Sequence, residues 1–511
     1  MKKILIISCV LMGFAMSAQN PQTKKITKKF FPDTEEVLNT TPALQKKRGF
    51  TDYEELLDFL NNLVEKYPDQ ISISFIGESQ KGREIPMVKL TAPNTKEKIK
   101  VWMQGGLHGN EPASTESMLY LLDRLLNDES YADILNNVEL AVVPMANIDG
   151  YLKNNRYAAN GLDLNRDQTK LMAPETVVLK KAYAEFNPEV AVDFHEYRPY
   201  RRDYARMGDF GVTNMYDAMF LYSGNLNIPE NLRNLTNGLF VENARQLLDK
   251  NEYTHHPYIS STKHYGDIHI NQGSISARSS ATNNALTNTI SSLIEIRGVA
   301  LGKTSFKRRM HSSFLIAVSY LRSAAENIQL VKDEIKKATS QENDVVINYE
   351  RGVYKDKVQF IDVSAAEYVE FEMTIRDAWK AKAKLKRPRP KAYIIDAERT
   401  LLIEKLETLG IKVRYLDEEK DYEVEQYIVE SYSKKPIRYE KMKLQSVEVS
   451  LVKENKTFPK GTAVIMMDQR RANLASVVLE PEAPNSFVSF GVLETQKGET
   501  LPIYRLINEA Q

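Results

Sequence analysis

Residues 100–126 read KVWMQGGLHGNEPASTESMLYLLDRLL, and this stretch decides the fold. The apolar run over residues 100–104 predicts a buried strand, and the spacing of apolar residues over 114–126 predicts a helix. The chain also predicts strands at residues 138–144, 190–194 and 291–296, and a helix at residues 175–186. Strands that alternate with helices predict an α/β fold, in which a mixed, largely parallel sheet carries helices on both faces.

The segment before this stretch extends the same domain. Thr51 or Asp52 can cap a helix in which apolar residues recur at helical spacing, and residues 71–76 and 85–90 predict two strands. Ligands of such sheets bind at the carboxyl ends of the strands. We therefore expect a functional site where the predicted strands at residues 100–104 and 190–194 end.

Length and composition limit the class of protein. A chain of 511 residues exceeds one ordinary core, so we expect two folded units. Apolar residues make up 42% and charged residues 27%, as in globular proteins, and the net charge is +1. This balance gives no field to attract nucleic acid or an anionic membrane, so neither is an expected partner. The sequence carries no signal for an oligomeric state.

The first eighteen residues predict a signal peptide for export to the periplasm or the medium. Lys2 and Lys3 precede an apolar run that ends in small residues, with cleavage expected after Ala18. The run is shorter than the ~20 apolar residues that span a membrane, so we expect no stable anchor. Lipid attachment at Cys9, the only cysteine, is the alternative. Cleavage after Ala18 would leave histidines and carboxylates as the ligands for a zinc site.

The remaining chain divides by composition. Residues 19–45 are polar and lysine-rich and predict a mobile leader, residues 46–335 predict the catalytic domain, and residues 340–511 predict a smaller α/β or α+β accessory domain. Residues 380–391, KAKAKLKRPRPK, predict a solvated linker or exposed loop, with contact to an anionic polymer as the alternative. Beyond this run, a strand at 392–396, a helix at 399–409 and a strand at 411–416 are predicted.

Two histidines and a glutamate form a candidate metal site. His108 and Glu111 lie three residues apart after a predicted strand, where a nitrogen and a carboxylate can face one metal ion. Catalytic zinc keeps three protein ligands, and His195 at the end of the strand VDFH is the candidate third. Position 199 is a proline, so His195-Glu196 does not begin a HExxH helix.

The segment between these ligands is specific. Residues 156–166 read RYAANGLDLNR, residues 78–86 read ESQKGREIP, and residues 143–150 read VPMANIDG. With HxxE at 108–111 and His195, this order of motifs resembles the M14 family of zinc metallocarboxypeptidases over roughly residues 50–325. The resemblance implies a zinc-dependent hydrolase, with one Zn²⁺ per chain, that cuts peptides at a free C-terminus.

The resemblance also implies roles for individual residues. His108, Glu111 and His195 match the zinc ligands, and Asp163 matches the carboxylate that orients the first histidine. The remaining matches concern the reaction. Glu295 is expected to be the general base, Arg156 to face the scissile carbonyl, and Asn165 and Arg166 to hold the substrate's terminal carboxylate. A salt bridge between Glu295 and Arg297 is the structural alternative for the glutamate.

Two features bear on the substrate. Tyr265 is the nearest candidate for a tyrosine that covers the substrate, but its spacing to Glu295 does not match, and we assign it no role. Residues 273–278 are expected at the pocket floor and contain no acidic residue, which argues against a preference for basic C-terminal residues. Arg278 in this segment either favours acidic residues or supports the loop.

Three functions remain open from the sequence. The first is a carboxypeptidase that acts on free C-termini, favoured by the presence of Asn165 and Arg166. The second is a zinc amidase that acts on cell-wall peptides or acyl-amino acids. The third is an inactive zinc protein that binds peptide tails, which would require a missing ligand or base.

Overall fold

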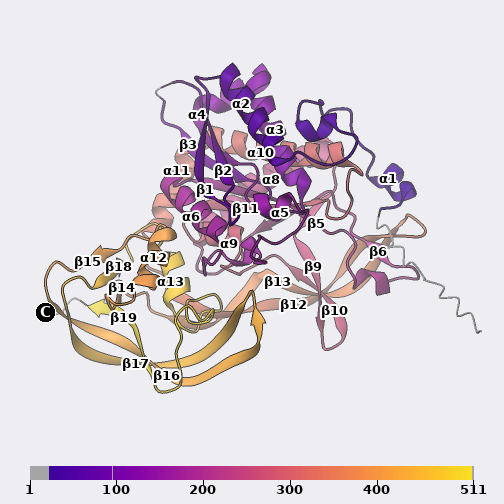
Figure 1. Cartoon of the computed structure of the whole chain (residues 1–511). Helices are drawn as coiled ribbons and strands as arrows, with labels where there is room; N and C mark the ends of the chain where they lie inside the picture. The colour runs from indigo at the N-terminus through magenta and orange to yellow at the C-terminus, as the bar shows by residue number, and fades with distance from the viewer. Residues whose placement is uncertain (1–21, 95, 509–511) are drawn as a thin grey trace, which may run out of the picture.

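The computed structural model describes residues 22–94 and 96–508 (Figure 1). The predicted signal peptide at residues 1–18 and its cleavage site lie outside these residues. Within the described part of the chain, no helix combines the length and apolar character needed to cross a membrane.

An eight-stranded mixed sheet forms the centre of the catalytic part. Its strands β4, β3, β5 and β11 are mutually parallel, as are β7 and β8, whereas β1, β2 and the β11–β7 pair run antiparallel. In sheet order the strands are β1 (Ile71–Glu78), β2 (Glu84–Leu90), β4 (Val138–Val143), β3 (Ile99–Gln104), β5 (Val190–Tyr197), β11 (Ile290–Arg297), β7 (Ala218–Tyr222) and β8 (His255–Pro257). The predicted fold class and the predicted strands of this part are confirmed.

Helices cover both faces of this sheet. Trp102 of β3 packs edge-on against Tyr183 of α6 (Pro174–Phe186), whereas Gly105, still paired to β4, lies against Ser114 of α3 (Pro112–Asn127). Because successive residues of a strand face opposite sides, the two helices lie on opposite faces. The predicted cap at Asp52 is confirmed: its side chain accepts from the Glu55 amide at the start of α2 (Tyr53–Lys66).

The other helices surround these elements. The longest of the described helices, α10, was not expected from the sequence and packs between α3 and α8. The set comprises α1 (Lys24–Phe30), η1 (Pro42–Gln45), η2 (Glu129–Tyr131), α4 (Ala132–Asn137), α5 (Ile148–Tyr151), η3 (Leu164–Arg166), η4 (Tyr204–Arg206), α7 (Glu230–Leu235), η5 (Thr236–Val241), α8 (Glu242–Lys250), α9 (Ser280–Ala285), α10 (Phe306–Glu326) and α11 (Ile328–Thr339).

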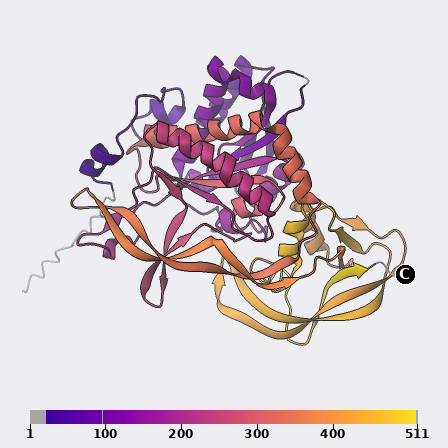
Figure 2. The same cartoon turned by 180° about the vertical axis from the view of Figure 1, so that it is seen from behind.

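A second sheet joins the catalytic part to the residues that follow position 340. Its order is β6 (Val212–Thr213), β12 (Val345–Asp362), β13 (Tyr368–Arg387), β10 (Asp267–Gln272) and β9 (Ile259–His264). The long β12–β13 hairpin is therefore bonded on both sides to catalytic strands, and Figure 2 shows it running beneath the catalytic helices. The boundary predicted near residue 340 does not separate two independent sheets.

The basic run at residues 380–391 is a correction to the sequence analysis. Residues 380–387 belong to β13 and pair with β12, with Lys382 opposite Glu350 and Lys386 opposite Val346. Alternation explains the strand: every second position from Lys380 to Lys386 is an exposed lysine, and the smaller or apolar residues between them are half-buried. The predicted linker is wrong for this stretch.

The C-terminal unit is an α+β layer built on a six-stranded sheet. Its order is β15 (Arg414–Tyr415), β18 (Ala463–Met466), β14 (Ala392–Ile395), β19 (Thr500–Asn508), β16 (Lys420–Tyr439) and β17 (Met442–Phe458), with helices α12 (Thr400–Thr408) and α13 (Ala472–Leu479). β14 and α12 confirm the predicted strand and helix, whereas only Arg414–Tyr415 of the strand predicted at 411–416 is a strand. The main apolar core runs without a break from the catalytic sheet into this unit, where it includes Tyr393, Leu406 and Val478.

The leader differs from its prediction. From Gln22 onward it packs on the molecule instead of being mobile: Ile26 and Phe31 are buried against Ile361 and Ala366. The Gln22 side chain donates to the Ser305 hydroxyl. Burial of these two apolar residues stabilises the packed segment, because it removes apolar surface from water, and Lys25 and Lys29 add bonds to the carbonyls of Ala365 and Ala366.

Candidate active site

His108, Glu111 and His195 meet in space at the carboxyl ends of β3 and β5. His108 lies in the loop after β3, Glu111 immediately precedes α3, and His195 lies in β5, which pairs with β3. The Glu111 carboxylate reaches Nδ1 of both histidines at 2.8 Å, and the two Nδ1 atoms are 3.0 Å apart. All three side chains are buried, and their ligand atoms lie within 4.8 Å of one another. Two imidazoles and one carboxylate are a zinc donor set that leaves a coordination position free.

A carboxylate anchors the outer nitrogen of each histidine. His108 Nε2 lies 3.1 Å from Asp163, and His195 Nε2 lies 2.8 Å from Asp193, which also accepts from the Ser280 hydroxyl. Such partners fix the tautomer and leave Nδ1 to face the metal. The sequence analysis missed Asp193, although its position two residues before His195 puts both side chains on the same face of β5.

Neighbouring positive charges keep the carboxyls of Glu111 and Asp163 ionised. Burial opposes the charged form of Glu111, but the two adjacent histidines outweigh it and hold the pKa of this carboxyl well below its usual range. Burial likewise opposes the charged form of Asp163, and His108 and Arg156 lower its pKa. Both carboxyls therefore stay ionised, as a ligand and its orienting partner require.

Glu295 lies beside the three candidate metal ligands His108, Glu111 and His195, which we call the metal-type group. β11 is parallel to β5 with Glu295 opposite His195, and the carboxyl lines the same cavity as His108. Burial and the nearby Glu111 raise the pKa of Glu295 to about 7. Within the described residues Glu295 forms no ion pair. The alternative bridge is absent, since Arg297 donates to Thr213, Gln22 and the Asn214 carbonyl.

Arg156 reaches the same centre from the loop before η3. Its Nε donates to Asp163 at 3.0 Å, and its Nη1 lies 3.2 Å from Nδ1 of His108. Burial disfavours the guanidinium, but Asp163 and Glu111 outweigh this and raise its pKa. The positive charge is thus fixed next to the metal-type group.

Asn165 and Arg166 belong to η3, which Asp163 caps by accepting from the Asn165 amide at 2.8 Å. The Asn165 side-chain oxygen accepts from the Ser280 amide, also at 2.8 Å, which fixes its orientation. Both residues line a cavity of about 460 Å³ together with Glu295. The structure thus brings every site residue expected from the sequence to one place.

The tyrosine that the sequence suggested as the nearest candidate to cover the substrate does not lie at the cavity. Tyr265 is almost fully exposed between β9 and β10 and does not line the cavity, whereas Tyr258, just before β9, does. Spacing to Glu295 gave no reason to single out Tyr258.

The tip of the β16–β17 hairpin contacts the site from the C-terminal unit. The Glu440 carboxylate accepts from the Asp163 amide at 2.9 Å, and Lys441 donates to the Asn160 carbonyl. The guanidinium of Arg278 lies 4.8 Å from the ring centre of Tyr439. The partners are 277 and 281 residues apart in the two hydrogen bonds, and Arg278 and Tyr439 are also far apart in the chain, so no local sequence signal could have indicated these contacts.

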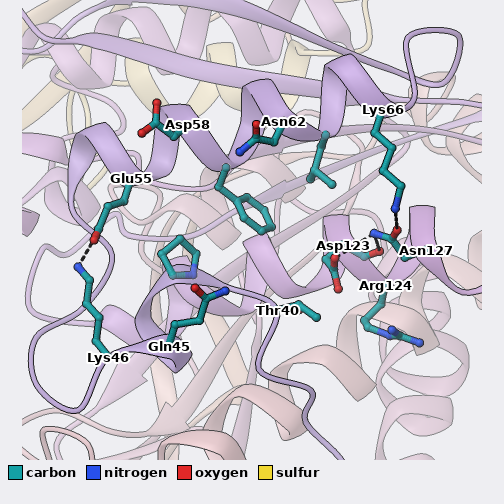
Figure 3. A pocket seen from close by; sticks show the side chains of 13 residues that line it. Thr40, Gln45, Lys46, Glu55, Asp58, Asn62, Lys66, Asp123, Arg124 and Asn127 are labelled. Atoms are coloured by element: carbon teal, nitrogen blue, oxygen red, sulfur yellow. Dashed lines mark hydrogen bonds and ion pairs between the residues drawn. The ribbon is translucent and has the colours of Figure 1, made fainter.

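A separate hollow of about 700 Å³ lies between residues 40–46 and helices α2 and α3 (Figure 3). Some of its polar side chains pair with one another, as Lys46 does with Glu55 and Lys66 with Asn127. No histidine lines it. In the part of the chain that the structure describes, the one group with metal-ligand geometry is that of His108, Glu111 and His195.

Together, the mixed sheet and a His–Glu–His group beside a glutamate are typical of a metal-dependent hydrolase. Comparison with known proteins identifies the family. The zinc carboxypeptidase family model matches residues 56–271. Carboxypeptidase 2 of Trichophyton equinum is 31% identical over 441 residues, which cover 84% of this chain and 81% of the relative. Carboxypeptidase 2 of Trichophyton rubrum is 31% identical over 445 residues, with the same coverage.

The chain belongs to the zinc carboxypeptidase family, and it is a metallocarboxypeptidase whose cofactor is zinc. A crystal structure of carboxypeptidase A from Helicoverpa armigera matches at a TM-score of 0.43 with 19% identity, covering 56% of this chain and 78% of that one.

Proposed function

We propose that the protein is an exported carboxypeptidase that releases residues from the free C-terminus of peptides, with Glu295 as general base. The observation that carries this proposal is the unpaired Glu295 carboxyl, which shares one cavity with the metal-type group and with Asn165 and Arg166. A base beside the three candidate metal ligands and a carboxylate-binding pair in the same cavity suit an exopeptidase.

His108, Glu111 and His195 would hold the zinc ion, which when bound would polarise the scissile carbonyl and lower the pKa of a water. The ionised Glu295 carboxyl is placed to accept a proton from the attacking water as the water oxygen bonds to the carbonyl carbon. The same carboxyl then donates the proton to the amide nitrogen as the carbon–nitrogen bond breaks. Arg156, fixed by Asp163, stabilises the negative charge that develops on the carbonyl oxygen.

Arg166 and Asn165 hold the terminal carboxylate of the substrate. The planar guanidinium of Arg166 can make two parallel charge-assisted bonds to it. Within the described residues, the Arg166 side chain donates only to the neighbouring Asn165 carbonyl. Its remaining donors are therefore available for a ligand.

Export follows from the predicted signal peptide, whose removal after Ala18 would leave the packing of the leader intact. Gln22 already bonds to Ser305 inside the molecule. N-terminal sequencing of the protein recovered from the periplasm or medium is expected to give Gln19. Recovery of the uncleaved chain from the cytoplasm alone would contradict export.

Activity is tested with the protein from Gln19 onward, metal analysis and a mixed peptide library read by mass spectrometry. We expect about one zinc per chain and loss of single C-terminal residues from free but not amidated peptides. Glu295→Gln is the matched control, and we expect it to keep zinc but lose about 10²- to 10⁴-fold in rate. Zinc without trimming would favour the amidase or peptide-binding alternative.

A further inference from the structure

Unpaired positive charge distinguishes the cavity beside the metal site. Its lining includes two acidic residues, Glu196 and Glu295, and Glu196 is already paired with Arg309. Six arginines line the same space, of which only Arg156 forms an ion pair within the described residues. The other five are Arg166, Arg198, Arg201, Arg278 and Arg351.

Two of these arginines are held in place without a carboxylate. Arg278 lies against the Tyr439 ring, and its guanidinium donates no hydrogen bond among the described residues. Arg351 uses Nη1 on the carbonyls of Gln272, Gly273 and Arg376. Each guanidinium is therefore oriented and retains unused donors. Both are partly buried, and this burial lowers the pKa of each, so an anion would stabilise their charged forms.

One terminal carboxylate does not supply an anionic partner for all the unpaired arginines of this cavity. Under the proposed function that carboxylate binds Arg166, which leaves four arginines of the lining without an anion. Of these four, Arg278 and Arg351 are the two whose guanidinium groups are held by the contacts described above. The nearby walls add the hydroxyl groups of Ser260 and Ser274, whereas those of Ser276 and Ser279 already donate to Asn485 and to the Ser276 carbonyl. Hydroxyls and guanidinium groups donate to a carboxylate. A basic side chain would meet several unpaired arginines there, and the one acidic lining residue without an ion pair is Glu295, the proposed base.

We propose that the residue released carries a carboxylate side chain, and that Arg278 and Arg351 are the specificity-determining residues that bind it. This proposal rests on the proposed carboxypeptidase function. It also gives the C-terminal part of the chain a role, because Arg351 belongs to β12 and Tyr439, which orients Arg278, belongs to β16.

The test compares peptides that differ only at the terminal side chain. Benzoyl-glycyl-glutamate and benzoyl-glycyl-glutamine are nearly isosteric, and the phenylalanine and lysine analogues report other preferences. We expect kcat/KM for glutamate to exceed that for glutamine by about 10- to 100-fold, which is what one charge-assisted hydrogen bond supplies. Equal or better cleavage of the glutamine, phenylalanine or lysine peptide would overturn the proposal.

Variants assign the preference to residues. Arg278→Gln and Arg351→Gln are each expected to reduce the glutamate-to-glutamine ratio about tenfold or more, mainly through KM. The exposed Lys382→Gln removes a positive charge on β13 and is expected to keep the ratio. If loss of the carbonyl contacts destabilises Arg351→Gln, Arg351→Lys is used as well, because it retains the positive charge. An unchanged ratio in folded variants at both positions would overturn the assignment.

Binding separates failure of this proposal from failure of the proposed function. Zinc-loaded Glu295→Gln is titrated by calorimetry with acetyl-glycyl-glutamate and acetyl-glycyl-glutamine. Tighter binding of the glutamate peptide, abolished by Arg278→Gln, would support the anionic subsite even if no peptide were cleaved. Equal binding of the two peptides would overturn the subsite, whatever the rate of cleavage.

Discussion

At the scale of single residues, the environment of Glu295 sets the pH range of the reaction. Burial and Glu111 raise its pKa to about 7, and a bound zinc cation would lower it again. The base works in its ionised form, so kcat/KM is expected to fall tenfold per pH unit on the acid side of a midpoint at or below about 7. Stopped assays from pH 4.5 to 8 measure this limb, and a rate that rises towards low pH would contradict the role.

The two anchoring carboxylates allow a matched comparison. Asp163→Asn weakens the bond to His108 and also alters the contact to Arg156, whereas Asp193→Asn acts on His195 alone among the ligands. We expect each to weaken zinc binding about 10- to 100-fold.

Only Asp163→Asn should also lower kcat in the zinc-saturated enzyme, because it releases Arg156. Chelator competition gives the zinc affinity, and assays in excess zinc give kcat. Equal kcat losses in the two saturated variants would contradict the specific link between Asp163 and Arg156.

The site residues that lie in short sequence motifs could be predicted from the sequence. His108, Glu111 and Asp163 lie in short ordered motifs, and His195 ends an apolar strand, so their meeting followed from strand ends on one sheet edge. Arg351 and Glu440 could not be predicted, because hairpins from another part of the chain deliver them to the site. Long-range contacts of this kind leave no periodic signal near the residues involved.

At the scale of elements, the β16–β17 turn combines strain with contact to the site. Glu440 and Lys441 have φ of 46° and 65°, a region that costs residues other than glycine about 1–2 kcal/mol each. Two-residue hairpin turns with positive φ favour Asn-Gly. The present pair instead supplies the contacts to Asp163 and Asn160.

Replacing Glu440-Lys441 by Asn-Gly should therefore separate stability from activity. We expect the free energy of unfolding to rise by about 1–2 kcal/mol as the strain is relieved. We expect kcat/KM to fall about 3- to 30-fold, because the Asp163 amide loses its acceptor. Thermal unfolding and kinetics are measured on the same preparation, and unchanged kcat/KM would contradict a positioning role for the tip.

Element prediction failed where composition and pattern disagreed. The lysines at residues 380–386 suggested a solvated linker, yet their alternation with alanine and leucine suits a strand with one exposed face. In the leader, lysine content concealed Ile26 and Phe31, which bury against the end of β12 and the turn that follows it. In both segments the spacing of the apolar residues predicted the structure better than the high lysine content did.

At the scale of the whole molecule, one apolar core and one shared sheet hold the two parts together. A chain cut after residue 340 would expose the β13-facing edge of β10 and the core side chains that contact the C-terminal unit. We expect this fragment to be insoluble or to lack cooperative unfolding.

The full protein is expected to unfold in a single thermal transition, recorded by calorimetry together with fluorescence. A soluble fragment ending at residue 340 that binds zinc, or two separated transitions in the full chain, would contradict this coupling. The control fragment ends at Asn508, the last described residue, and should unfold as the full chain does.

The pairing of β10 with β13 has a further consequence for biosynthesis. His269 pairs with Thr374, so about 100 residues must be made after β10 before its partner exists. At a synthesis rate of about 5–20 residues per second, this edge stays open for on the order of 5–20 seconds in each new chain. During that interval the β13-facing edge of β10 has no partner strand, and an unpaired edge is a place where another chain can pair.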